Sequence, residues 1–333
     1  MFSNLTTRAS AMRAAVIAMI PAFAACSDAP TALSARGADR LEDASAARVC
    51  TRCENPIVFD ASPANNGSAT HIFTVSADGT GLTQLTSGVA KHMQPGWSAA
   101  YQQIVFVSDR YSPGMALQVY TMIPKAGIMK RLTYSGVPEH SPAFSADGKK
   151  ITFVRNVAGG TRVVVMNADG SGEVVFPYNG SLAPSFSPDG QRVIFSSTMH
   201  STAGDEQARE IYMANVDGTN LVRITTDGLW NHNPVWTPDG KKIVFESYRG
   251  SVDGIYKMNP DGSSIEALAV AAVGSNDWLG WATVNASSTK VLFWTDMAGK
   301  DELRIVGMNG GATTVVPVPA SIEPGSASWS FAR

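Results

Sequence analysis

The sequence is poor in the residues that most often carry chemistry. Among its 333 residues there are only three cysteines and five histidines, and charged residues make up 16%. The formal net charge is −2, and no stripe of lysine or arginine is present that would neutralise phosphates, which excludes nucleic acid as a partner. The sequence also lacks G-x-S-x-G, H-E-x-x-H and P-loop motifs, so it offers no recognisable catalytic signature.

No apolar run near the N-terminus is long enough to span a bilayer. The apolar run over residues 14–25 follows Arg8 and Arg13, and it falls short of the ~20 residues that a membrane helix needs. A charged start, a short apolar run and small residues at its end are typical of a secretory signal, so we predict a signal peptide over residues 1–25. Residues 23–26 (Phe-Ala-Ala-Cys) resemble a bacterial lipobox, which implies acylation of Cys26 and a lipid-anchored protein of the periplasm or outer membrane. Plain secretion, with Cys26 unmodified, and a buried N-terminal helix are the alternatives.

The remaining cysteines form a close pair. Residues 26–54 contain little apolar periodicity and read as a tether that carries Cys50 and Cys53 near its end. In an oxidising compartment this pair predicts a small disulfide, although free thiols or a metal or redox role are alternatives.

The sequence does contain a clear internal repeat, and this repeat determines the predicted architecture. An aromatic residue followed by a turn recurs about every 45 residues. It occurs at Trp97, Phe144, Phe186, Trp236, Trp281 and Trp329. Three short strands follow each of the first five turns, for example residues 104–106, 119–122 and 131–133 after Trp97. Four short strands per unit of this length are the signature of a propeller blade.

Counting the strands predicts how the ring closes. If the four strands of a unit are lettered A to D, the chain begins B-C-D at residue 57 and ends with a lone A at Trp329, and each letter occurs six times. We therefore predict an all-β, six-bladed β-propeller with four-stranded blades over residues 55–333, in which the C-terminal strand completes the first blade. Such closure leaves no exposed sheet edge, so a monomer is expected.

The repeats resemble a known family. Residues 184–190 (Pro-Ser-Phe-Ser-Pro-Asp-Gly) and 234–240 (Pro-Val-Trp-Thr-Pro-Asp-Gly) look like the WD40-like PD40 repeats of TolB-type propellers, as do residues 107–110 and 166–170. The resemblance covers about residues 55–333 and implies an exported propeller of the cell envelope.

Two groups of residues are candidate sites. Because strands alternate in direction, the A–B and C–D turns lie on one face of the ring (the turn face) and the B–C and D–A loops on the other (the variable face). The longest B–C insertion, about residues 198–210, is the predicted partner-binding loop. It carries His200, Asp205, Glu206, Arg209 and Glu210. A second set precedes strand A and is expected at the mouth of the central channel, where it would suit a divalent metal or small ligand. It comprises His92, His140, His232 and Asp277. The alternative is that these residues only cap loops.

Two functions remain open from the sequence. The first is a non-enzymatic binding or scaffolding module that docks an envelope protein or peptide on the variable face. The second is a metal-dependent carbohydrate-active enzyme of the polysaccharide lyase type. Some TolB-like propellers, the oligogalacturonate lyases, have a histidine-bound metal in the channel, which is what the resemblance implies for that alternative.

Overall fold

The fold is seen in a computed structural model that describes residues 39–40, 56–63, 69–98, 100, 102–111, 116–201 and 208–329. The predicted signal peptide, Cys26, Cys50, Cys53, Asp205 and Glu206 lie outside these residues. The described helices are two short 3-10 turns, η1 (Pro124–Ala126) and η2 (Met297–Gly299), and neither is long or apolar enough to cross a bilayer.

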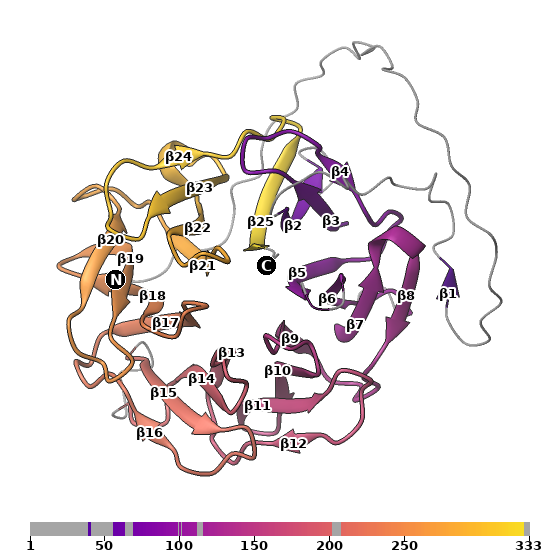
Figure 1. Ribbon diagram of the computed structural model, residues 1–333, viewed down its shortest axis with the longest axis horizontal. Helices are drawn as coiled ribbons and strands as arrows, with labels where there is room; N and C mark the ends of the chain where they lie inside the picture. Colours follow the sequence, from indigo (N-terminus) through magenta and orange to yellow (C-terminus); the bar gives the residue numbers. More distant parts are fainter. Residues whose placement is uncertain are drawn as a thin grey trace. The chain divides into compact units, whose positions relative to one another are not determined.

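Six antiparallel sheets are arranged in a ring, and the prediction of a six-bladed propeller is confirmed (Figure 1). The innermost strand of each blade is strand A. These strands are β25 (Ile322–Trp329), β5 (His92–Ser98), β9 (Glu139–Phe144), β13 (Ser181–Phe186), β17 (Trp230–Trp236) and β21 (Leu279–Val284) for blades 1 to 6.

Strands B to D complete the blades outward. Strands B are β2 (Ile57–Pro63), β6 (Gln103–Ser108), β10 (Lys150–Val157), β14 (Arg192–Ser197), β18 (Ile243–Arg249) and β22 (Lys290–Thr295). Strands C are β3 (His71–Val75), β7 (Gln118–Ile123), β11 (Gly160–Asn167), β15 (Glu210–Asn215), β19 (Val252–Met258) and β23 (Glu302–Gly307). Strands D are β4 (Thr83–Gln84), β8 (Ile128–Arg131), β12 (Val174–Val175), β16 (Val222–Arg223), β20 (Glu266–Val270) and β24 (Thr314–Val315). A two-residue strand, β1 (Asp39–Arg40), pairs with β8.

The core lies between neighbouring blades. Strands B and C are buried on both faces, because each sheet packs against the sheets on either side, and this is why they read as continuous apolar runs. Between blades 1 and 2, for example, Val58 and Ile72 pack against Ile104, Phe106 and the anchor of blade 2. The sheet order β25-β2-β3-β4 confirms that the C-terminal strand completes the first blade.

The aspartates of the repeated Asp-Gly turns stabilise these turns by accepting hydrogen bonds within them. In blade 3, Asp147 accepts hydrogen bonds from the Ser145 hydroxyl (2.7 Å) and from the Lys149 amide (3.0 Å). Gly148 follows with φ of 70°, a conformation that favours glycine. The same arrangement recurs at Asp189 and Asp239. These side chains hold the turns and are not free to act on a ligand.

Candidate functional site

A central cavity is built from the same stretch of all six innermost strands. Every strand A pairs with its strand B through a register shift, and in five blades one bulge residue has a positive φ between 44° and 55°. These bulge residues are Gln94, Ser141, Ala183, Asn233 and Trp281. From the bulges to the A–B turns, the strands enclose a cavity of about 820 Å³ at the turn face.

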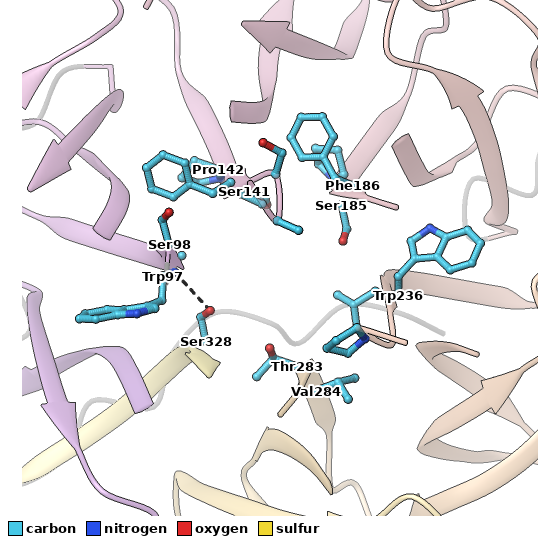
Figure 2. Close-up of a pocket in the computed structure, with 18 of the residues that line it drawn as sticks. Trp97, Ser98, Ser141, Pro142, Ser185, Phe186, Trp236, Thr283, Val284 and Ser328 are labelled. Atoms are coloured by element: carbon cyan, nitrogen blue, oxygen red, sulfur yellow. Dashed lines mark hydrogen bonds between the residues drawn. The ribbon is translucent and has the colours of Figure 1, made fainter. Parts of the chain in front are cut away.

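The cavity wall is nearly uncharged. Side chains of Ser185, Thr283 and Ser328 line the wall around the axis (Figure 2), and prolines follow four of the bulges, as at Pro142. The one charged residue among the described lining residues is Asp147, which is engaged in its turn. Hydroxyl groups and proline rings suit a neutral, extended ligand such as a peptide, and they provide no charge that would hold an anion.

Side chains of one blade clamp the bulge of the next. The Asp60 carboxylate of blade 1 accepts a hydrogen bond from the backbone N–H of Gln94 in blade 2 (2.7 Å). The side-chain oxygen of Gln94 in turn accepts one from the backbone N–H of Ser141 in blade 3 (2.7 Å). Ser326 also donates to Asp60 (3.0 Å). Burial raises the pKa of Asp60 to about 6, against the weaker lowering effect of these hydrogen bonds. The clamps fix the relative positions of the blades around the cavity.

The four residues expected at the channel mouth are spread over different environments. His92 is buried, with its ring 6.2 Å from that of His71, and burial together with His71 and Arg110 lowers its pKa to about 4. His140 and His232 occupy equivalent positions in β9 and β17, opposite Val154 and Glu246.

Asp277 lies in the loop before β21. Within the part of the chain that the structure describes, no group of three or more His, Cys, Asp or Glu side chains is placed to hold a metal ion. The metal site therefore stays a prediction without a described set of ligands.

One repeat assignment was wrong, and the reason is the bulge. The sequence spacing suggests Trp281 as the aromatic anchor of blade 6, but the register pairs Val284 with Val291, as Trp236 pairs with Ile243 in blade 5. Trp281 has φ of 51° and is the bulge residue, with 41% of its surface exposed. Val284 occupies the anchor position, and Asp277 consequently lies seven residues before its anchor, whereas His140 and His232 lie four residues before theirs.

The described ends of the predicted partner-binding loop are tied to the scaffold. His200 stacks on Tyr212 and its Nδ1 lies 2.7 Å from the tyrosine hydroxyl. Arg209 exchanges backbone hydrogen bonds with the segment around Trp230, through Leu229 and Asn231.

Glu210 is buried and accepts hydrogen bonds from Thr225, the Gly228 amide (2.8 Å) and Arg223 (2.9 Å). Glu210 therefore holds blade 4 to the following loop and is not available to a partner, whereas Arg209 forms an isolated β-bridge with Trp230.

A tryptophan cluster on the variable face was missed by the sequence reasoning. It consists of two ring pairs of blades 5 and 6, Trp230 with Trp278 and Trp281 with Trp294, and Trp281 also lines the central cavity. The Trp230 and Trp278 rings meet edge to face with centroids 6.1 Å apart, and the Trp281 and Trp294 rings are 5.2 Å apart. Trp278 is 58% exposed. Four of the seven tryptophans thus lie away from the anchor positions, and this departure from the repeat period was the available signal.

Carboxylates accept hydrogen bonds from the backbone of the segment that carries Trp278 and Trp281. The amide of Trp278 donates to Asp296 (2.6 Å), that of Leu279 to Asp253 (3.0 Å) and that of Trp281 to Glu246. Burial, with the nearby charges of Glu246 and Asp296, raises the pKa of Asp253 to about 6. Hydrogen bonds to three successive parts of this short segment fix its backbone, so the two tryptophan side chains project from a rigid support.

Comparison with known proteins agrees with this architecture. The sequence matches the PD40 family, described as the TolB beta propeller domain, over residues 60–180 and 141–330. The chain belongs to the TolB β-propeller family. The resemblance seen in the repeats is therefore confirmed.

Relatives of this TolB-type propeller are distant. An uncharacterised protein of Agrobacterium fabrum is 28% identical over 172 residues, which are 49% of this chain and 56% of that protein. A TolB homolog of Chlorobium luteolum is 30% identical over 147 residues, 44% of this chain and 31% of that protein. TolB from Acinetobacter baumannii superposes with a TM-score of 0.71 at 18% identity, covering 83% of this chain and 67% of that structure. The matched part spans about half or less of the length of the curated relatives. At 18% identity, the likeness to the solved structure shows the fold alone.

Proposed function

We propose that this chain is an exported, lipid-anchored propeller that binds a protein or peptide partner of the cell envelope on its variable face. The observation that carries the proposal is the tryptophan cluster. Large apolar side chains are costly to leave in water, and rigid, exposed aromatic residues are the side chains that most often dominate binding energy at protein interfaces. The lipobox-like residues ending at Cys26 and the family membership support an envelope location.

The surroundings of the cluster suit a docking surface. Tyr248, 51% exposed, lies opposite Trp230 in the β17–β18 pairing, and Val273, 88% exposed, lies in the loop before β21. The end of the long B–C loop of blade 4 joins the same area through Arg209. Aromatic anchors bordered by loops of a rigid scaffold are the arrangement in which binding surfaces are usually found.

The experiment is a comparison of partners captured by cross-linking in envelope fractions. A wild-type bait and the double variant Trp278→Ala/Trp281→Ala are compared with a control, Tyr134→Ala, which removes another exposed aromatic residue in the loop after blade 2. The captured protein is then purified and its affinity is measured by calorimetry. We expect the double variant to weaken binding by roughly 2 kcal/mol or more, as for interface hot spots, and the control to leave it unchanged. A partner that binds all three proteins equally would contradict this location of the site.

The metal-dependent lyase remains a second prediction from the sequence. No feature among the described residues favours it, because the described lining of the central cavity contains neither histidine nor a cationic side chain that would suit a uronate.

A further inference from the structure

The chemistry around the tryptophan cluster indicates which group the partner presents. Four segments of blades 5 and 6 form the variable face here: residues 227–232, 246–254, 275–281 and 294–302. They contain seven carboxylates and two lysine or arginine residues, and Arg304, just after the last segment, forms an ion pair with Glu302 (2.8 Å). The carboxylates are Asp227, Glu246, Asp253, Asp277, Asp296, Asp301 and Glu302. The whole chain, by contrast, is nearly neutral, so the negative charge is concentrated at this surface.

One of the two cationic side chains is already engaged. Arg249 forms an ion pair with Asp227, donates to Asn231 (3.0 Å) and lies over the rings of Phe245 and Tyr256 at 5.8 and 5.5 Å. Its charge is thus already paired with that of Asp227. Lys300 is exposed and is the other cationic residue of these segments.

The exposed aromatic rings of blade 2 provide an internal comparison. There, the Arg131 guanidinium lies 4.5 Å from the ring centroid of Tyr134 and 5.7 Å from that of Tyr111. Among the residues that the structure describes, no arginine or lysine lies over any ring of the tryptophan cluster. Tryptophan is the aromatic residue that attracts a cation most strongly through its ring face.

We propose that the tryptophan cluster binds a cationic group, an alkylammonium or guanidinium, on a basic peptide segment of the partner. Aromatic faces attract the cation and cover its apolar stem, while the surrounding carboxylates attract it from a distance. This inference rests on the proposed function and adds the chemical class of the partner. A neutral sugar also stacks on tryptophan, but it carries no charge that the surrounding carboxylates would attract.

The test uses three soluble probes with the full chain: pentalysine, pentaglutamate and the neutral sugar maltopentaose. Tryptophan fluorescence and calorimetry report binding. We expect pentalysine to bind, and its Kd to increase about tenfold in Trp278→Ala/Trp281→Ala, which leaves the charge unchanged. Raising the salt concentration from about 50 to about 500 mM should weaken binding further, because it shortens the screening length. Asp277→Asn/Asp301→Asn should weaken it several-fold, and Tyr134→Ala should not change it.

The outcomes separate this inference from the proposed function. Pentalysine binding that is equal in the wild type and the tryptophan double variant would overturn the inference, because the attraction would then be a general charge effect. Binding of maltopentaose in place of pentalysine would overturn it in favour of a glycan. If envelope partners still depend on the two tryptophans in either case, the docking function stands and only the cationic class is wrong.

Discussion

At the scale of the residue, burial of single carboxylates makes the ring sensitive to pH. Asp60 has its pKa raised to about 6, so between about pH 4 and 6 the folded state holds a proton that the unfolded state has lost. The unfolded state then binds fewer protons, and this group lowers stability as pH rises through that window. The loss is roughly 3 kcal/mol at neutral pH, from 1.36 kcal/mol per pKa unit.

Asp60→Asn is therefore expected to gain stability relative to the wild type as pH rises. The amide keeps an oxygen for the Gln94 and Ser326 donors but does not titrate. Urea unfolding of both proteins should show this. Between about pH 4 and 7, the free energy of unfolding of the variant should rise by roughly 2–3 kcal/mol relative to that of the wild type. Asp78→Asn is a control that should show little change over this range, because hydrogen bonds from Thr80 lower the pKa of Asp78 and its carboxyl group stays largely ionised down to about pH 4. A pH-independent difference for Asp60→Asn would show that its carboxyl group has an ordinary pKa.

At the scale of the element, the strands were predictable and the bulges were not. The turns are encoded locally, because an aspartate and a glycine within five residues determine them, as at Asp147 and Gly148. The bulge clamps join residues of different blades, such as Asp60 and Gln94, and no spacing within one repeat reveals such a pair. The bulge also explains the wrong anchor of blade 6, since an aromatic residue at 281 imitates the repeat while the ladder continues to Val284.

The reassignment of the anchor has a measurable consequence. Trp236→Ala should destabilise the protein by about 3–5 kcal/mol, because it empties a buried anchor position between blades 4 and 5. Trp281→Ala removes a side chain of the same size from the bulge, where it is 41% exposed, and should lower the free energy of unfolding by less than about 1 kcal/mol. Urea denaturation of the two variants gives both values. Similar losses would mean that Trp281 is an anchor after all.

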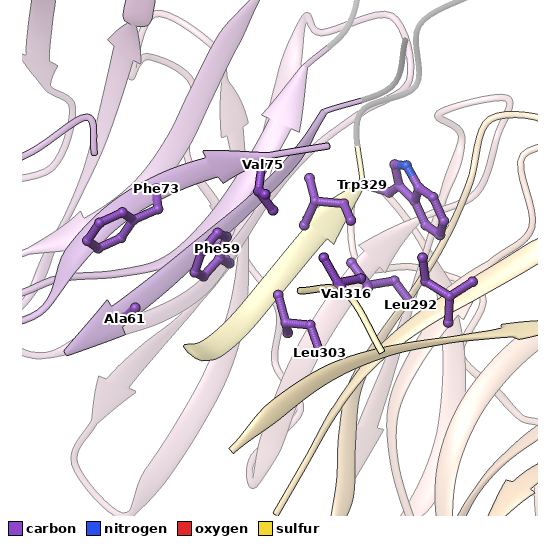
Figure 3. Packing of buried hydrophobic residues seen from close by; sticks show 10 residues of the cluster. Phe59, Ala61, Phe73, Val75, Leu292, Leu303, Val316 and Trp329 are labelled. Carbon is purple, nitrogen blue, oxygen red and sulfur yellow. The ribbon is translucent and has the colours of Figure 1, made fainter. Parts of the chain in front are cut away.

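At the scale of the whole molecule, stability depends on joining the two ends of the described ring. In Figure 3, β25 runs beside β2, and Trp329 lies near Leu292 of blade 6. The cluster around it includes residues from both the first and the last blade, with Ile57 fully buried and Trp329 only 4% exposed. Removing β25 would leave the ladder of β2 unpaired and the cluster open to water, and an unpaired edge of this kind promotes association.

A chain that ends at residue 321 should accordingly lose its cooperative unfolding transition and self-associate, which calorimetry and size-exclusion chromatography detect. A circular permutant is the matched control: it starts at Val137, ends at Gly136 and joins the old termini through a flexible linker. Gly136 has φ of 73° in an exposed loop with open space around it, so a break there disturbs little packing. The permutant keeps β25 and should unfold cooperatively near the wild-type Tm. A monomeric, cooperative truncated chain would show that five complete blades and three strands suffice, and that closure by β25 serves the shape of the central cavity rather than the survival of the ring.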